Sequence, residues 1–138
     1  MKTVVVDASF AGMWILPDES SKRAEGYLAD ILSGDVIMAV ADLWHVEMIN
    51  MMLVAIKRKR INEEQAGEAL ELLDQLPLQT FDHQNVLWKK RMIMLARRFG
   101  LSAYDAAYVE LADRLQCPLL TSDRDVQAAA EQLGIPLS

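Results

Sequence analysis

The chain has 138 residues, of which 52% are hydrophobic and 25% charged, a profile that indicates one folded domain and excludes disorder or a fibrous repeat. Its formal net charge of −6 argues at first against a nucleic-acid partner, because phosphate-binding proteins usually carry a basic surface. A single cysteine, Cys117, excludes an internal disulfide, and with neither a signal-peptide core nor a membrane-length apolar run we expect a cytoplasmic protein with no membrane partner.

Apolar runs rich in β-branched residues alternate along the chain with helical patterns. In chain order we expect a strand over 3–7, helices over 8–16 and 18–32, a strand over 36–40, helices over 42–60 and 63–76, a strand over 78–81, helices over 84–99 and 102–115, a strand over 118–121, a helix over 125–133 and a strand over 135–137. The expected starts and caps are Asp18 or Ser20 for the second helix, and Asp42, Asn62 and Ser102 for later helices. This alternation predicts an α/β fold, a three-layer α/β/α domain over residues 1–138 with a central parallel sheet.

The helix over 42–60 contains a single glutamate, Glu47, in the otherwise nearly apolar segment LWHVEMINMMLVAI. We expect a helix that is apolar on every side to be buried against the sheet. A lone carboxylate there must be neutralised, paired or bound to a metal ion, because its desolvation costs on the order of several kcal/mol. Asn50 follows one helical turn later and lies on the same face of the helix.

Three further acids are expected near Glu47. In parallel sheets the functional crevice lies beyond the carboxyl ends of the strands. Asp7 ends the first strand and Asp123 follows the strand PLLT, so both belong at that edge. Asp105 lies in the first turn of a helix whose N-terminus points back to the same edge, and Glu47 lies about 7 Å along its own helix from the rim.

Each of these acids has a structural alternative when it is taken alone. Asp7 could be a turn residue, Glu47 could pair with a buried arginine, Asp105 could complete a capping box with Ser102, and Asp123 could cap a helix. Four carboxylates at one edge would repel one another, and a divalent cation resolves this repulsion. A site of hard oxygen donors favours Mg²⁺ or Mn²⁺.

Short polar residues beside the acids are candidates for supporting them. They are Ser9, Asn50, Thr121 and Ser122, although each hydroxyl could equally be a helix cap, and for Ser122 the cap is the better explanation. The two histidines, His45 and His83, show no ligand spacing, so a zinc site is not expected.

The segments VVVDAS, LWHVEMIN, GLSAYDAAYVELA and LLTSDRDV resemble the PIN-domain nucleases, and specifically the VapC-type toxins of bacterial and archaeal toxin–antitoxin modules. The resemblance implies that Asp7, Glu47, Asp105 and Asp123 form the acidic, metal-binding catalytic quartet. Thr121 matches the hydroxyl that supports the quartet, while Ser9 and Asn50 match less constant positions. Asp125 offers a second carboxylate near Asp123, and we favour Asp123 because it falls on the T-x-D position.

The family implies an endoribonuclease that needs Mg²⁺ or Mn²⁺, forms a homodimer and is held by an antitoxin protein in the acidic groove. The chain's basic clusters would then supply the contacts to the phosphates of RNA, unless they are only solvated helix faces. These candidate RNA-binding residues are Lys57, Arg58, Lys59, Arg60, Lys89, Lys90 and Arg91. A PIN-like module that binds RNA or a partner protein without cleaving is the alternative.

Overall fold

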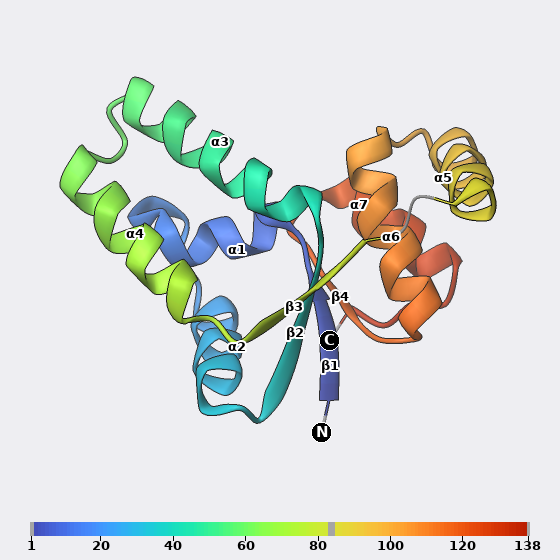
Figure 1. The fold of residues 1–138 in the computed structure, drawn as a ribbon, viewed down its shortest axis with the longest axis horizontal. Coiled ribbons are helices and arrows are strands. Elements are labelled where there is room, and N and C mark those ends of the chain that lie inside the picture. The colour runs from blue at the N-terminus through green and yellow to red at the C-terminus, as the bar shows by residue number, and fades with distance from the viewer. Residues whose placement is uncertain (1, 83–84, 138) are drawn as a thin grey trace.

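The computed structural model describes residues 2–82 and 85–137. These residues form a four-stranded parallel sheet in the order β3-β2-β1-β4, covered by helices on both faces (Figure 1). The strands are β1 (Lys2–Val6), β2 (Val36–Ala41), β3 (Leu78–Phe81) and β4 (Leu119–Leu120). The helices are α1 (Ala8–Ile15), α2 (Lys22–Ser33), α3 (Leu43–Lys57), α4 (Glu63–Gln75), α5 (Val86–Phe99), α6 (Ala103–Leu115) and α7 (Arg124–Gln132). The predicted three-layer α/β/α fold is confirmed.

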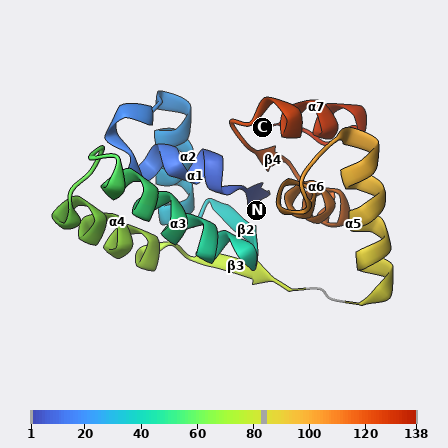
Figure 2. The ribbon, with the colours of Figure 1, turned by 90° about the horizontal axis from the view of Figure 1, so that it is seen from above.

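The two helical layers separate along the sequence. Helices α1 to α4 gather on one side of the sheet and α5 to α7 on the other, as the view from above shows (Figure 2). Strands β1 and β2 are buried on both faces, with Val4, Val5 and Val6 at 0% exposure, as expected for the centre of a parallel sheet. Val6 pairs with Leu120, so the carboxyl ends of β1 and β4 lie side by side.

Several predicted boundaries were wrong, each for a local reason. The second helix begins at Lys22 and is capped by the side chain of Ser21, while Pro17–Glu19 forms a separate 3₁₀ turn. Residues 135–137 form no strand, although the N–H of Leu119 donates to the carbonyl of Pro136 at 3.0 Å. Because Pro136 has no N–H, it cannot return a ladder hydrogen bond.

Of the two helix caps expected at Asn62 and Asp42, only Asn62 forms a capping hydrogen bond. Asn62 caps α4 as its position predicted, and the side chain of Gln65 completes a capping box with it that was not predicted. Asp42 occupies the cap position of α3 in a helical conformation and its side chain makes no capping hydrogen bond. Helix α5 begins at Val86, and the predicted start at Gln84 lies outside the described residues.

Helix α3 is less buried than its composition predicted. Trp44 and Met48 are buried, but Val46, Ile49 and Leu53 are 69%, 52% and 60% exposed. The helix contacts α1 and α4 instead of lying flat on the sheet, and α3 and α4 project together from the domain (Figure 1). The side of α3 that carries Val46, Ile49 and Leu53 is therefore exposed to solvent. No helix within residues 2–82 and 85–137 is long and apolar enough to cross a lipid bilayer.

Candidate active site

Asp7 lies at the junction where β1 ends and α1 begins, and its side chain is only 4% exposed. Its Oδ1 accepts hydrogen bonds from the Ser9 hydroxyl at 2.7 Å and from the Phe10 N–H at 2.9 Å, so it caps α1. Burial raises the pKa of this carboxyl above its ordinary value, while the surrounding donors lower it and the negative charge of Asp105 raises it further. The net shift of the pKa is upward, so the fold disfavours the charged form of Asp7.

A chain of hydroxyl contacts joins the ends of β1 and β4. The Ser9 hydroxyl lies 3.3 Å from that of Thr121 and accepts the N–H of Ser122 at 3.0 Å. The Thr121 hydroxyl in turn accepts the N–H of Asp123 at 3.0 Å. Ser9 and Thr121 therefore lie beside the acids as predicted, and Ser122 contributes its backbone.

Asp123 and Asp125 differ in their surroundings. Asp123 is half-buried, and its Oδ1 caps α7 by accepting the N–H groups of Asp125 at 2.9 Å and Val126 at 3.1 Å. Asp125 is exposed in the first turn of that helix. The pKa of Asp105 is raised first by burial and then by the charge of Asp123, with a smaller contribution from Asp125. Asp123 is therefore the acid that interacts more strongly with Asp105.

Asp105 lies in the first turn of α6, where its backbone N–H donates to the Ser102 hydroxyl at 3.1 Å. The reciprocal bond, from the Ser102 N–H to the Asp105 side chain, is not formed. The capping-box alternative is thus only half realised, because Ser102 caps the helix and the Asp105 carboxylate does not. This side chain, half-buried, remains at the edge of the sheet.

Glu47 is half-buried on α3, and its partner is Tyr108 of α6, whose hydroxyl donates to Glu47 Oε1. A buried arginine was the alternative considered from the sequence, and none contacts Glu47 among the described residues. Burial raises the pKa of Glu47, and the charges of Asp7 and Asp105 raise it further. Burial and the Glu47 carboxylate together raise the pKa of Tyr108 far above its ordinary value, so its hydroxyl stays protonated.

Tyr108 is not among the site residues predicted from the sequence. The residue lies three positions after Asp105, in the segment SAYDAAYVELA, and therefore on the same face of α6 as that acid. This spacing is the signal that could have identified it, although an aromatic residue at such a position is more often a plain core residue.

The four acids lie near enough that their charges act on one another, yet they are not arranged as ready ligands. Within residues 2–82 and 85–137, no three Asp, Glu, His or Cys side chains are placed so that they could hold a metal ion. Asp7, Glu47 and Asp123 each accept hydrogen bonds from their own chain.

The donor set nevertheless fits a hard divalent ion. The bonds to Asp7, Glu47 and Asp123 each converge on one carboxylate oxygen, which leaves the second oxygen of each for a ligand role. Mg²⁺ needs only one or two carboxylates and keeps several waters, so it does not require three side chains in direct contact.

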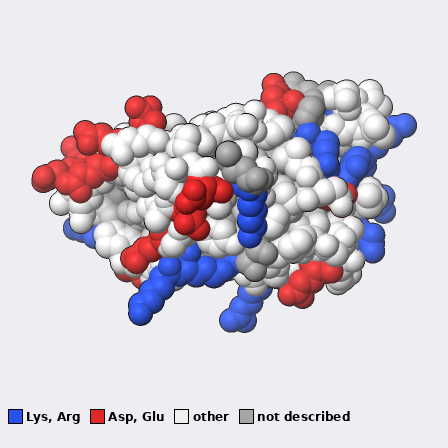
Figure 3. Space-filling model, turned by 90° about the horizontal axis from the view of Figure 1, so that it is seen from below, with Lys and Arg blue, Asp and Glu red and all other residues white. Residues whose placement is uncertain are grey.

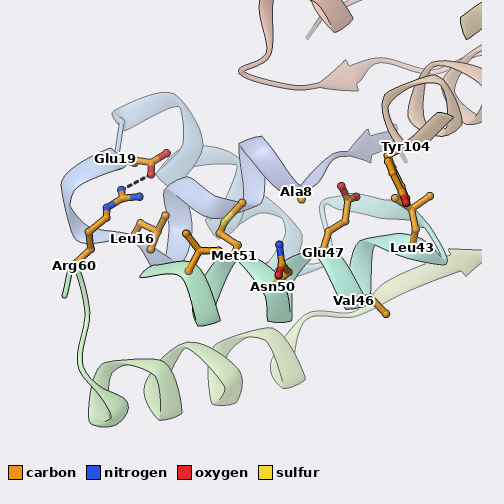
Figure 4. A pocket seen from close by; sticks show the side chains of 11 residues that line it. Ala8, Leu16, Glu19, Leu43, Val46, Glu47, Asn50, Met51, Arg60 and Tyr104 are labelled. Carbon is orange, nitrogen blue, oxygen red and sulfur yellow. Dashed lines mark hydrogen bonds and ion pairs between the residues drawn. The ribbon is translucent and has the colours of Figure 1, made fainter. Parts of the chain in front are cut away.

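A groove of about 600 Å³ leads away from Glu47 between α1 and α3. Glu47, Asn50 and Met51 point from α3 toward α1 across it (Figure 4). Its apolar lining includes Leu16 and Val54, and Arg60 and Glu19, which form an ion pair, line it as well. Asn50 thus shares the face of Glu47, as its spacing predicted.

The predicted RNA-binding residues lie away from the acids. Lys57 is ten residues after Glu47 on α3, about 15 Å along the helix axis. Arg60 pairs with Asp18 and Glu19, and Arg91 pairs with Asp113 at 2.7 Å, so these two guanidinium groups are engaged within the chain. The remaining members of the clusters are exposed, namely Lys57, Arg58, Lys59, Lys89 and Lys90.

Charge is distributed unevenly over the surface. Seen from below, acidic side chains gather over the end of the molecule formed by α4, and basic side chains gather over α5 at the opposite end (Figure 3). His45 hydrogen-bonds Thr80 at 2.9 Å and does not approach the acids, while His83 lies outside the described residues. The site is therefore built from carboxylates and hydroxyls.

A three-layer domain with acids gathered at the carboxyl edge of its parallel strands is the architecture of the PIN class. The chain belongs to the PIN-domain family, since the PIN domain matches residues 4–132. It is 32% identical over 135 residues to Ribonuclease VapC3 of Pyrobaculum aerophilum, covering 96% of this chain and 98% of that protein. Its fold is similar to the crystal structure of PAE2754 from Pyrobaculum aerophilum, with a TM-score of 0.67, 20% identity, and coverage of 93% of this chain and 86% of that chain.

Proposed function

We propose that this protein is a metal-dependent endoribonuclease, the toxin component of a type II toxin–antitoxin system that hydrolyses RNA phosphodiester bonds. The observation that carries the proposal is the convergence of Asp7, Glu47, Asp105 and Asp123 from four separate segments on one edge of the sheet. The 32% identity to a ribonuclease along nearly the whole chain supports the same activity.

Asp7, Glu47, Asp105 and Asp123 would hold Mg²⁺ or Mn²⁺. When bound, the ion would supply a water of lowered pKa and would offset the charge that develops on the phosphate. Ser9 and Thr121 orient the acids at the ends of β1 and β4, so these side chains need little rearrangement on binding. The upward pKa shifts of Glu47 and Asp105 suit either one to accept the proton of the attacking water as general base. Water attack would leave a 5′-phosphate and a 3′-hydroxyl.

Exposed lysines on both sides of the site would contact the phosphates of the RNA. Lys57 ends α3 and Lys59 follows it, while Lys89 and Lys90 lie on α5, and all four side chains are exposed. Arg60 and Arg91 contribute less, because their charges are already partnered. The acidic and apolar groove beside Glu47 suits a basic, apolar segment of an antitoxin protein. The exposed apolar side chains of α3 and α5 support a homodimer. The site of action in this proposal is the cytoplasm.

Cleavage of a labelled RNA in Mg²⁺ or Mn²⁺ tests the proposal. We expect the parent protein to cut single-stranded or structured RNA, and Asp7→Asn and Asp105→Asn to lose activity while their circular dichroism is unchanged. Asp30→Asn, which changes an exposed carboxylate on α2, is the matched control and should cut normally. Parent activity that survives EDTA, or full activity in the two site variants, would contradict the mechanism.

A second candidate function is a module that binds RNA or a partner protein without cleaving it. The observation in its favour is that no three acids of the described residues are arranged as metal ligands. Isothermal titration calorimetry with Mn²⁺ separates the two candidates. A catalytic site requires saturable uptake, whereas RNA binding with no Mn²⁺ uptake and no cleavage would favour the binding module.

A further inference from the structure

Tyr108 connects two helices that otherwise pack against different neighbours. Helix α6 lies against the sheet, α5 and α7, while α3 lies against α1 and α4. The side chain of Tyr108 is 1% exposed, and its hydroxyl reaches across to Glu47 Oε1. Within the described part of the chain the hydroxyl has no other partner, so the bond to Glu47 satisfies this buried donor.

Glu47 needs such a restraint if it is to face the other acids. Its side chain has three rotatable bonds, it is half-buried, and the charges of Asp7 and Asp105 repel it. Turning toward solvent would lower the free energy of a glutamate in that position, because its charge is hydrated there. The neutral hydroxyl of Tyr108 offsets this preference for solvent by hydrogen-bonding Glu47, and it leaves the negative charge of Glu47 available to a cation.

The hydrogen bond from Tyr108 uses only one of the two carboxylate oxygens of Glu47. Tyr108 binds Oε1, so Oε2 can turn toward the acids of β1 and α6. Figure 4 shows the Glu47 carboxylate directed from α3 toward the start of α1, which is where Asp7 lies. Tyr108 also lies one turn after Asp105 on α6, so a single helix sets the positions of one acid and of the donor that orients another.

We propose that Tyr108 is a positioning residue, whose hydroxyl fixes the Glu47 carboxylate in the orientation needed to bind a divalent cation. The proposal rests on the proposed function, in which Glu47 is a ligand. Partners that orient a metal ligand typically change metal affinity about 10- to 100-fold when they are removed.

Mn²⁺ affinity measured by calorimetry on the intact chain tests the role. Tyr108→Phe keeps the ring and removes the hydroxyl, and we expect the Kd for Mn²⁺ to rise about 10- to 100-fold. Tyr104→Phe is the matched control, because it removes a hydroxyl from an exposed tyrosine on the same helix and should leave the Kd within about twofold of the parent. Glu47→Gln completes a double-mutant cycle, and adding Tyr108→Phe to Glu47→Gln should weaken Mn²⁺ binding no further.

Restoring the donor provides a second variant. We expect 4-aminophenylalanine incorporated at Tyr108, which presents an N–H in place of the O–H, to return the Kd to near the parent value. A Kd in Tyr108→Phe equal to that of the parent would overturn the proposal, as would additive losses in the cycle or a failure of the amine to restore binding. A parent protein that takes up no Mn²⁺ would instead refute the proposed function, so the two failures are distinguishable.

Discussion

Replacing Asp7 by asparagine should stabilise the metal-free protein while removing its response to metal. Asparagine caps helices as well as aspartate does, so it can keep the bond from the Phe10 N–H at the start of α1. The substitution removes a charge on a side chain that is 4% exposed and that Asp105 repels. The pKa of Asp7 is raised even with its hydrogen bonds present, so burial outweighs those bonds, and removing the charge is favourable.

We therefore expect the free energy of unfolding at pH 7 to increase. For a domain of this size each kcal/mol gained would raise the Tm by about 3–5 °C. The gain should shrink as the pH falls, because protonation of Asp7 then removes the same charge in the parent. The relevant window lies between the ordinary aspartate pKa of about 4 and the raised value in the folded protein.

Differential scanning calorimetry with EDTA and with Mn²⁺ measures both effects. Mn²⁺ should raise the Tm of the parent and of the control Asp30→Asn, and it should leave that of Asp7→Asn almost unchanged. A lower Tm for Asp7→Asn than for the parent in EDTA at pH 7 would refute the reasoning, since Asp7 would then stabilise the fold as an ordinary cap.

Two further outcomes are expected. The Mn²⁺ affinity of the parent, measured by calorimetry from pH 8 to pH 5, should fall as the pH is lowered. The raised pKa values of Asp7, Glu47 and Asp105 let protons compete with Mn²⁺ above the ordinary carboxyl pKa, and a constant affinity over this range would contradict this. Arg60→Met should lower the Tm only slightly, because the ion pairs of Arg60 are exposed and screened by solvent. The same variant should reduce RNA affinity less than Lys57→Met does. An equal loss of RNA affinity would show that Arg60 contacts RNA despite its ion pairs.

Much of the fold follows from local signals in the sequence. The β-branched run TVVV indicated a strand buried on both faces, and Asn62 indicated the start of α4, where the structure adds the reciprocal bond of Gln65. The rule that parallel strands present their carboxyl ends at one edge then placed Asp7 and Asp123 together. Asp105 and Glu47 followed from the direction of the helices that carry them.

Features that depend on packing were not predictable in the same way. The composition of α3 indicated burial on every side, yet whether Val46 and Leu53 are covered depends on where α4 lies, and the sequence does not specify that. The engagement of Arg60 by Asp18 joins segments 42 residues apart, and no periodicity reports such a contact. Tyr108 was unpredictable for the same reason. An aromatic residue on a buried helix face is typical of a core residue, and only the tertiary structure shows that its hydroxyl donates to Glu47.

Among the residues that the structure describes, the donors to the carboxylates at the acidic edge are uncharged. The hydroxyl groups of Ser9 and Tyr108 donate hydrogen bonds to carboxylates there, and backbone N–H groups donate the other hydrogen bonds to Asp7 and Asp123. The ion pairs of the described residues lie elsewhere, on Arg60, Arg91 and Arg114. A site selected only for stability would place an arginine among these acids, because a paired charge removes the repulsion that raises their pKa values. Neutral donors orient the carboxylates and leave their negative charge intact, which is the condition that a site for a divalent cation requires.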